Sequence, residues 1–343
     1  MRTHRIQAQN TLDRDARLRL YHSIHIISLF SFLMLIFYTA EPFLHRAVKT
    51  FLSYAFAKDT VLIQTIERIY AMFAYACTFF VPLFITLLIF SKNGISRRAA
   101  NPNISFSMKL PSRPLASIFA VIGILYVIGD ITGAIFAFLG KIGLPIAVAE
   151  RTLPDTPPDM LLYFISSVIL PAIVEELIFR GYILHLLLPH GRTFAILVSG
   201  VLFGVMHFYL PQLLYATVAG ILIGCLVVQS GSVWCGIFLH IINNLLVYVS
   251  DMASVLLDAP SYAFFSIVLK GIIYLCAMVG LILVFANGFG SYKKSFDDFT
   301  EHSTTYTSTL STEIAVRYAL IPPLIVYLLC AFIQTAYNSF IFL

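Results

Sequence analysis

The sequence predicts an all-α protein, a polytopic transmembrane helical bundle of eight to nine spans, from three observations. Apolar residues make up 59% of the 343 residues and charged residues only 11%, whereas soluble domains carry about 25% charged residues. The apolar residues form blocks that can cross a bilayer, which takes roughly 20 residues. Basic residues are also distributed unevenly between the loops on the two sides of these blocks.

Nine stretches qualify as candidate spans: 22–40, 69–91, 115–139, 161–186, 193–210, 212–229, 232–250, 271–289 and 317–340. Only Pro211 separates the fifth from the sixth, and Pro322-Pro323 interrupts the last, so eight spans are also compatible with the pattern. The first run is too long for a signal peptide and lacks a small-residue cleavage site, so we expect it to be an anchor.

The basic residues predict the orientation of the chain. With the N-terminus inside, inside segments carry 13 Lys and Arg residues and outside loops carry six. Lys and Arg favour the cytoplasmic side. We therefore expect a multi-pass protein of the cell (plasma) membrane with a cytoplasmic N-terminus. The net charge of +5 is then mainly a topology signal, and nothing in it indicates nucleic acid binding.

Four regions follow from this pattern. They are a basic cytoplasmic tail (1–21), an accessory transmembrane region (22–150), a polar-centred transmembrane core (151–255) and a C-terminal transmembrane region (256–343) with a polar loop at 291–315. The five cysteines form no CxxC pair and lie in or beside spans, so we expect buried free thiols.

Polar residues inside the spans concentrate in the core region. Ionisable groups at this depth are costly, and they normally face a protein interior or a wet cavity. The set spans three neighbouring candidate spans: Glu175, Glu176, Arg180, Phe203, His207, His240 and Asn244. Asp130 is a further intramembrane acid that we rank below this set, and Lys270, at the start of a predicted span, is expected to snorkel.

Helical geometry gives the two glutamates different roles. Residues four apart share a helix face, so Glu176 can pair with Arg180. Glu175 is turned by about 100° from Glu176 and is left to act as a general base. His207 and His240 could join it in activating water, and Asn244 could stabilise an oxyanion. No serine or cysteine nucleophile lies convincingly beside these groups.

A metal and a metal-free mechanism both remain open at this stage. Glu175, His207 and His240 form a zinc-compatible set, and hydrolytic zinc sites keep a position for water. Without metal, a glutamate and a histidine can activate water directly. Zinc is therefore an alternative cofactor for the same three residues.

The three motifs resemble the signature of the CPBP family, which includes the CAAX-type prenyl endopeptidases and the Abi bacteriocin-processing proteins. They are Glu175-Glu176-x-x-x-Arg180, Phe203-x-x-x-His207 and His240-x-x-x-Asn244. The resemblance covers about 161–250 and implies an intramembrane endopeptidase with these residues in its catalytic site. It implies a peptide or protein-tail substrate at the membrane, reached from the cytoplasmic side or laterally from lipid.

Two other classes of function remain as alternatives. A non-catalytic bacteriocin-immunity or scaffold protein would keep the fold and would not need Glu175. A haem- or proton-handling protein could use His207 and His240 as axial ligands or relay groups. The oligomeric state is open in all three cases.

Overall fold

The chain is a bundle of long α-helices in the computed structural model, which describes residues 2–56, 59–92, 114–146, 153–154, 156–286 and 322–340. The described ranges contain no strand, so the all-α prediction is confirmed. The longer helices are α1 (Arg2–Ala55), α2 (Thr60–Lys92), α4 (Pro114–Lys141), α8 (Arg192–Val205), α9 (Leu210–Ser230), α10 (Val233–Leu256), α11 (Ala259–Ala286) and α14 (Pro322–Phe340). Between α4 and α8 runs a continuous helical stretch of α5 (Pro157–Phe164), η1 (Ile165–Ile169), α6 (Leu170–Ile178), η2 (Phe179–Leu184), α7 (His185–Leu187) and η3 (Leu188–His190).

Eight helices in the described ranges are long and apolar enough to cross a membrane. The exception among the predicted spans is 193–210. Its helix, α8, has 14 residues and is therefore about 21 Å long, whereas the hydrocarbon core is about 30 Å thick. Of the predicted eight to nine spans, the described residues therefore form eight.

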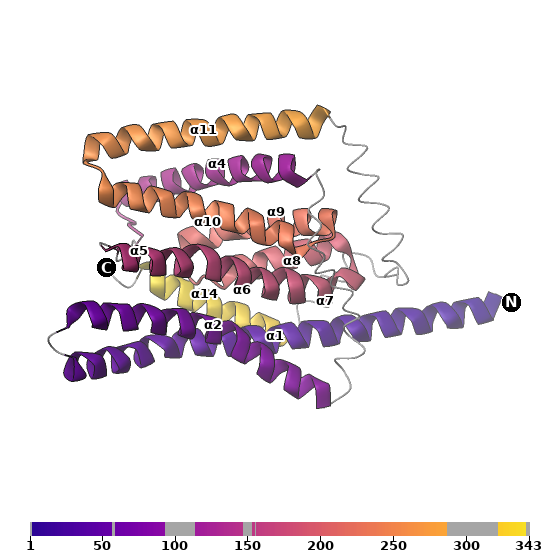
Figure 1. Ribbon diagram of the computed structural model, residues 1–343. Helices are drawn as coiled ribbons and strands as arrows, with labels where there is room; N and C mark the ends of the chain where they lie inside the picture. Colours follow the sequence, from indigo (N-terminus) through magenta and orange to yellow (C-terminus); the bar gives the residue numbers. More distant parts are fainter. Residues whose placement is uncertain are drawn as a thin grey trace.

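Long antiparallel helices define the arrangement (Figure 1). Helix α1 packs along α2 and also contacts α14, while α4 packs along α11 at the opposite edge of the bundle. The N-terminal end of α1 projects beyond the other helices. Helix ends therefore fall on two faces, and we call the one on the side of the N-terminus the N-face and the other the far face.

Helices α8 and α9 form an antiparallel hairpin whose backbones touch through glycine. A Cβ on Gly220 would lie 2.9 Å from the Cα of Gly200, and a Cβ on Gly204 would lie 1.9 Å from Oγ1 of Thr217. Small residues allow membrane helices to approach this closely, and the packing adds van der Waals contact. Gly200, Gly204 and Gly220 thus allow the close packing of this hairpin.

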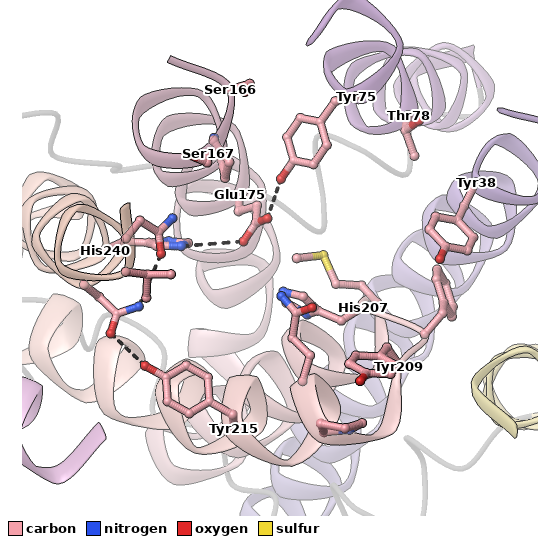
Figure 2. A pocket seen from close by; sticks show the side chains of 18 of the residues that line it. Tyr38, Tyr75, Thr78, Ser166, Ser167, Glu175, His207, Tyr209, Tyr215 and His240 are labelled. Atoms are coloured by element: carbon pink, nitrogen blue, oxygen red, sulfur yellow. Dashed lines mark hydrogen bonds and ion pairs between the residues drawn. The ribbon is translucent and has the colours of Figure 1, made fainter. Parts of the chain in front are cut away.

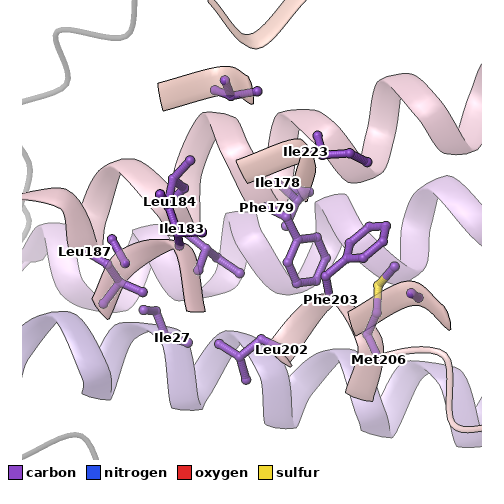
Figure 3. Close-up of a cluster of buried hydrophobic side chains, with 14 of the residues drawn as sticks. Ile27, Ile178, Phe179, Ile183, Leu184, Leu187, Leu202, Phe203, Met206 and Ile223 are labelled. Atoms are coloured by element: carbon purple, nitrogen blue, oxygen red, sulfur yellow. The ribbon is translucent and has the colours of Figure 1, made fainter. Parts of the chain in front are cut away.

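The buried core lies where this hairpin meets α1 and the helices around η2 (Figure 3). Phe179, Ile183 and Leu184 from η2 are 1% or less exposed, and they pack with Ile27 of α1 and Leu202 of α8. Helices α2 and α11 bury only 17% of their most apolar stretches. They form the outer layer, and their apolar side chains face the lipid.

One prediction about the outer layer is wrong. Helix α11 begins at Ala259 rather than near 271, so Lys270 lies well inside the helix and does not snorkel from its end. Its Nζ lies 2.6 Å from Oδ1 of Asp130 on α4. The predicted polar loop at 291–315 and the basic segment 93–113 lie outside the described residues.

Candidate active site

The two glutamates lie on a short α-helical segment between two π-helical ones. Helix α6 has nine residues, with η1 before it and η2 after it. Single-turn π segments within α-helices are frequent at functional sites. Pro171 is the second residue of this segment, directly after η1, and its missing N–H removes one helical hydrogen bond. The helix is therefore disturbed beside Pro171 in the form of a π-helical turn.

Glu176 and Arg180 form the expected ion pair and are both completely buried. Nη1 of Arg180 donates to Oε1 of Glu176 at 2.9 Å, and Nη2 donates to the carbonyl of Gly220 on α9 at 3.0 Å. The pair thus joins α6 and η2 to the α8–α9 hairpin. Burial without water favours such a pair only when its hydrogen bonds are well made.

Phe203 occupies the centre of this group, which explains its place in the second motif. The Cζ atom of Arg180 lies 4.3 Å from the centroid of the Phe203 ring, in cation–π geometry. The ring also packs edge-on against His207 at 5.3 Å and His240 at 6.0 Å between centroids. Because this side chain packs against both imidazoles, it fills the space that a haem between them would need.

His240 connects the two glutamates. Its Nδ1 lies 3.1 Å from Oε1 of Glu176, and its Nε2 lies 4.0 Å from Oε2 of Glu175. A carboxylate can only accept a hydrogen bond, so Nδ1–H donates to Glu176. Glu176 therefore orients His240, and Nε2 of His240 is directed toward Glu175.

Glu175 faces the accessory helices as well as the core. The hydroxyl of Tyr75 on α2 donates a short hydrogen bond to Oε1 of Glu175. Tyr75 lies in the region predicted as accessory, 100 residues before Glu175. No periodic or motif signal distinguishes Tyr75 in the sequence, since it is one of several aromatic residues in an apolar run.

His207 lies in the tight turn between α8 and α9. Its Nδ1 lies 2.8 Å from the carbonyl of Phe203, so it donates there and leaves Nε2 for chemistry. The next residue, Phe208, has φ of 48°, a conformation that bulky residues rarely adopt. Nδ2 of Asn338 on α14 donates to the Phe208 carbonyl at 2.7 Å, and Oγ of Ser339 accepts from Leu210 N–H at 3.0 Å. The C-terminal helix therefore holds the turn that carries His207.

The asparagine position contains two residues that act together. The hydroxyl of Tyr215 on α9 donates to Oδ1 of Asn243 at 2.7 Å, and Nδ2 of Asn243 donates to Oδ1 of Asn244 at 3.2 Å. With its carbonyl engaged, the Asn244 amide is left with its N–H groups as donors. Asn244 is a predicted site residue, whereas Tyr215 and Asn243 lie outside the three motifs.

One cavity of about 1150 Å³ is lined by the polar residues of the site other than the buried ion pair: Tyr75, Glu175, His207, Tyr215, His240, Asn243 and Asn244. Figure 2 shows Glu175, His207 and His240 directed into it, with Tyr75 and Tyr215 on its walls. Asn244 also lines the cavity. The structure thus brings together Glu175, His207, His240 and Asn244, while Glu176 and Arg180 support them from behind.

The three predicted zinc ligands have the donor atoms that zinc binds, but their side chains lie too far apart to form a metal site. Both histidines engage Nδ1 with an acceptor, as metal ligands usually do, and Glu175 is nearby. However, no group of three or more His, Cys, Asp or Glu side chains in the described ranges is gathered closely enough to hold an ion. Glu175, His207 and His240 would have to move together to bind zinc.

Comparison with known proteins identifies the segment that carries this site. Residues 157–246 match the family described as Type II CAAX prenyl endopeptidase Rce1-like. The chain is 31% identical over 126 residues to the Bacillus subtilis (strain 168) protein named "Putative membrane peptidase YdiL". That match covers 36% of this chain and 51% of the relative, so the chain spans about half the length of the curated relative it matches. No solved structure matches the chain significantly.

The fold and site define a multi-pass helical membrane protein with a carboxylate, two histidines and an asparagine around an intramembrane cavity. Its segment 157–246, which holds all three motifs, is the part that matches the Rce1-like family. The resemblance drawn from the motifs is confirmed.

Proposed function

We propose that this protein is an intramembrane endopeptidase in which Glu175 activates water to cleave a peptide bond. The observation that carries the proposal is the convergence of Glu175, His207, His240 and Asn244 on one cavity within a family segment of peptidase type. General bases are effective when they lie within reach of the reacting water. Substrates are peptides or protein tails held at the membrane.

The reaction follows from the roles of these groups. A water molecule placed between Glu175 and His207 gives a proton to the Glu175 carboxylate while its oxygen attacks the carbonyl carbon of the substrate. The Asn244 amide stabilises the oxyanion that forms. Glu175 then returns the proton to the amine nitrogen as the C–N bond breaks. His240, held by Glu176, keeps Glu175 in place and can share the proton.

Zinc remains an alternative within this proposal. The ion would be held by Glu175, His207 and His240, and it would lower the pKa of bound water and polarise the substrate carbonyl. Full activity after exhaustive chelation, with no metal in the purified protein, would exclude it.

The test compares Glu175→Gln with wild type in detergent-purified protein. A library of short peptides, with and without a prenyl or acyl group, serves as substrate. We expect the variant to lose at least about a hundredfold in rate, within the usual contribution of a general base. Asp130→Asn is the matched control, because Asp130 is an intramembrane carboxylate that does not line the cavity. Equal cleavage by Glu175→Gln and wild type would refute the mechanism, and no cleavage by either would favour the immunity or scaffold alternative.

A further inference from the structure

The catalytic cavity extends to one face of the bundle. Its lining includes Ile146, which follows α4 on the far face. The cavity walls near the far face carry Arg68, Tyr163 and Asp251. Each of these residues lies within about two turns of a helix end on that face. Glu175 lies deeper in the bundle, 18 residues after the start of α5 at Pro157 on the far face, or roughly 27 Å along a helix.

The short helix α8 explains why the cavity is on this side. It starts at Arg192 on the N-face and ends at Val205, before it can cross the membrane. The turn at 206–209 and the start of α9 line the cavity through Met206, His207, Tyr209 and Pro211. They form a floor between the cavity and the N-face, while the space above the floor continues toward the far face. The core between this floor and the N-face is filled by buried apolar side chains.

The cavity mouth is acidic. Glu41 and Asp251 both line it, and the one described Arg or Lys in its lining, Arg68, forms a bidentate ion pair with Asp159. These four groups carry a formal net charge of −2. In a cleft with low-dielectric walls, such a charge attracts cations and repels anions.

We infer that the substrate enters this cavity from the far face and that its entering segment is neutral or positively charged. The excess of basic residues in the N-terminal tail and the 92–114 segment makes the N-face cytoplasmic. The far face is then extracytoplasmic, and the substrate is an extracytoplasmic polypeptide segment rather than a cytoplasmic tail. The identification of the entering polypeptide as a substrate rests on the proposed function, whereas the direction of access to the cavity does not.

Thiol labelling in intact bacterial cells tests the direction of access without any need for activity. Three single substitutions are made in the full chain: Asp258→Cys at the exposed far-face end of α10, Ser166→Cys in the cavity wall, and Asp15→Cys on the exposed N-face part of α1. A small, charged, membrane-impermeant thiol reagent is added outside. Unsubstituted protein, with its five native cysteines, gives the background.

We expect Asp258→Cys and Ser166→Cys to react in intact cells and Asp15→Cys to react only after permeabilisation. Reaction of Asp15→Cys but not Asp258→Cys would show the opposite orientation and overturn the inference. Reaction of Asp258→Cys without Ser166→Cys would show that the cavity is closed to the far face, which also overturns it. A protein that cleaves nothing still gives this result, so failure of the proposed function is distinguishable.

Peptide charge tests the second part once a substrate is known. Variants of one cleaved peptide carry Lys or Glu near the cleaved bond. We expect the Lys peptide to have the lower KM, and Asp251→Asn to raise that KM by about fivefold with kcat unchanged, since removing a charge about 4 Å away in water weakens binding by about that factor. Asp258→Asn, on the same face but outside the cavity lining, is the control. A Glu peptide bound as tightly as the Lys peptide would contradict the charge preference.

Discussion

Two charge clusters lie inside the membrane region of this protein, and they differ in what surrounds them. Glu176 and Arg180 are 0% exposed and belong to a network with His240 and Gly220. Asp130 and Lys270 are 48% and 49% exposed on the outer surface between α4 and α11. Both clusters contain an ion pair with a direct hydrogen bond, so the pairing of charges does not by itself mark a site.

The difference lies in the groups that the pair positions. The buried pair orients a histidine toward Glu175 and supports the floor of a cavity. The outer pair is completed by the hydroxyl of Tyr274, which donates to Oδ2 of Asp130 at 2.6 Å, and these three residues line no part of the cavity. We interpret it as a link between α4 and α11. Four substitutions test this contrast.

The largest effect is expected for Arg180→Met. It leaves the Glu176 carboxylate in an apolar interior without its cation, and breaking a buried pair in this way costs about 3–5 kcal/mol. The free energy of unfolding in detergent measures the loss. The double variant Glu176→Gln/Arg180→Met removes both charges and should recover much of it. A loss below about 1 kcal/mol would mean that the pair contributes as little as an exposed one.

A smaller effect is expected for Gly236→Ala, which adds a methyl group beside the buried pair. A Cβ on Gly236 would lie 2.9 Å from Oε2 of Glu176 and 2.8 Å from Cγ2 of Val227. Overpacking of this kind costs about 1–3 kcal/mol. Gly271→Ala, next to Lys270, is the matched control, because a Cβ there meets nothing within 4 Å and alanine favours the helix. Thermal unfolding of the two variants should shift in opposite directions.

Tyr75→Phe should affect the reaction more than the fold. The variant removes the hydrogen bond to Glu175 and leaves the ring in place, so we expect about a tenfold loss in kcat, which corresponds to about 1.4 kcal/mol, with KM unchanged. Steady-state kinetics on a cleaved peptide measure the two constants separately. Phe79→Leu is a control, since this ring contacts Tyr75 and has no polar group. An unchanged kcat would show that Tyr75 does not position the base.

The smallest effect is expected for Lys270→Met. Tyr274 still donates to Asp130 in this variant, and pairs that are half exposed contribute about 0–1 kcal/mol. Unfolding in detergent and peptide cleavage should both stay close to wild type. A loss in the free energy of unfolding as large as that of Arg180→Met would show that the outer pair stabilises the fold as much as the buried pair does.

The sequence predicted the site where local spacing carries the information. The four-residue separation of Glu176 and Arg180 places both on one helix face, so their pair could be derived, and the stacking of Phe203 on His207 follows from the same rule. The helical class followed from the apolar blocks. These predictions needed no knowledge of how distant helices pack.

Contacts between distant helices could not be derived in this way. Tyr75 reaches Glu175 across 100 residues, and Asn338 reaches the Phe208 carbonyl across 130. Tyr75 is one of several aromatic residues in its helix, and Asn338 is one of several polar residues in its helix, so the residue type marks neither of them. Lys270 was misjudged for a local reason, since Pro260, Ser261 and Tyr262 give no apolar signal although α11 includes them.

The π-helical segments on either side of α6 have a consequence for how this chain tolerates changes in length. A π turn holds one residue more than the α turn it replaces. Deleting one residue from η1, such as Ser166, could therefore be absorbed as an ordinary α turn without interrupting the helix. The part before the deletion, with Asp159 and Tyr163, would then keep its orientation, because the π turn already accommodates the extra residue, and Glu175 and Glu176 would keep their partners. The chain can thus lose one residue ahead of the two glutamates and leave both the wall of its entrance and the reacting groups in register.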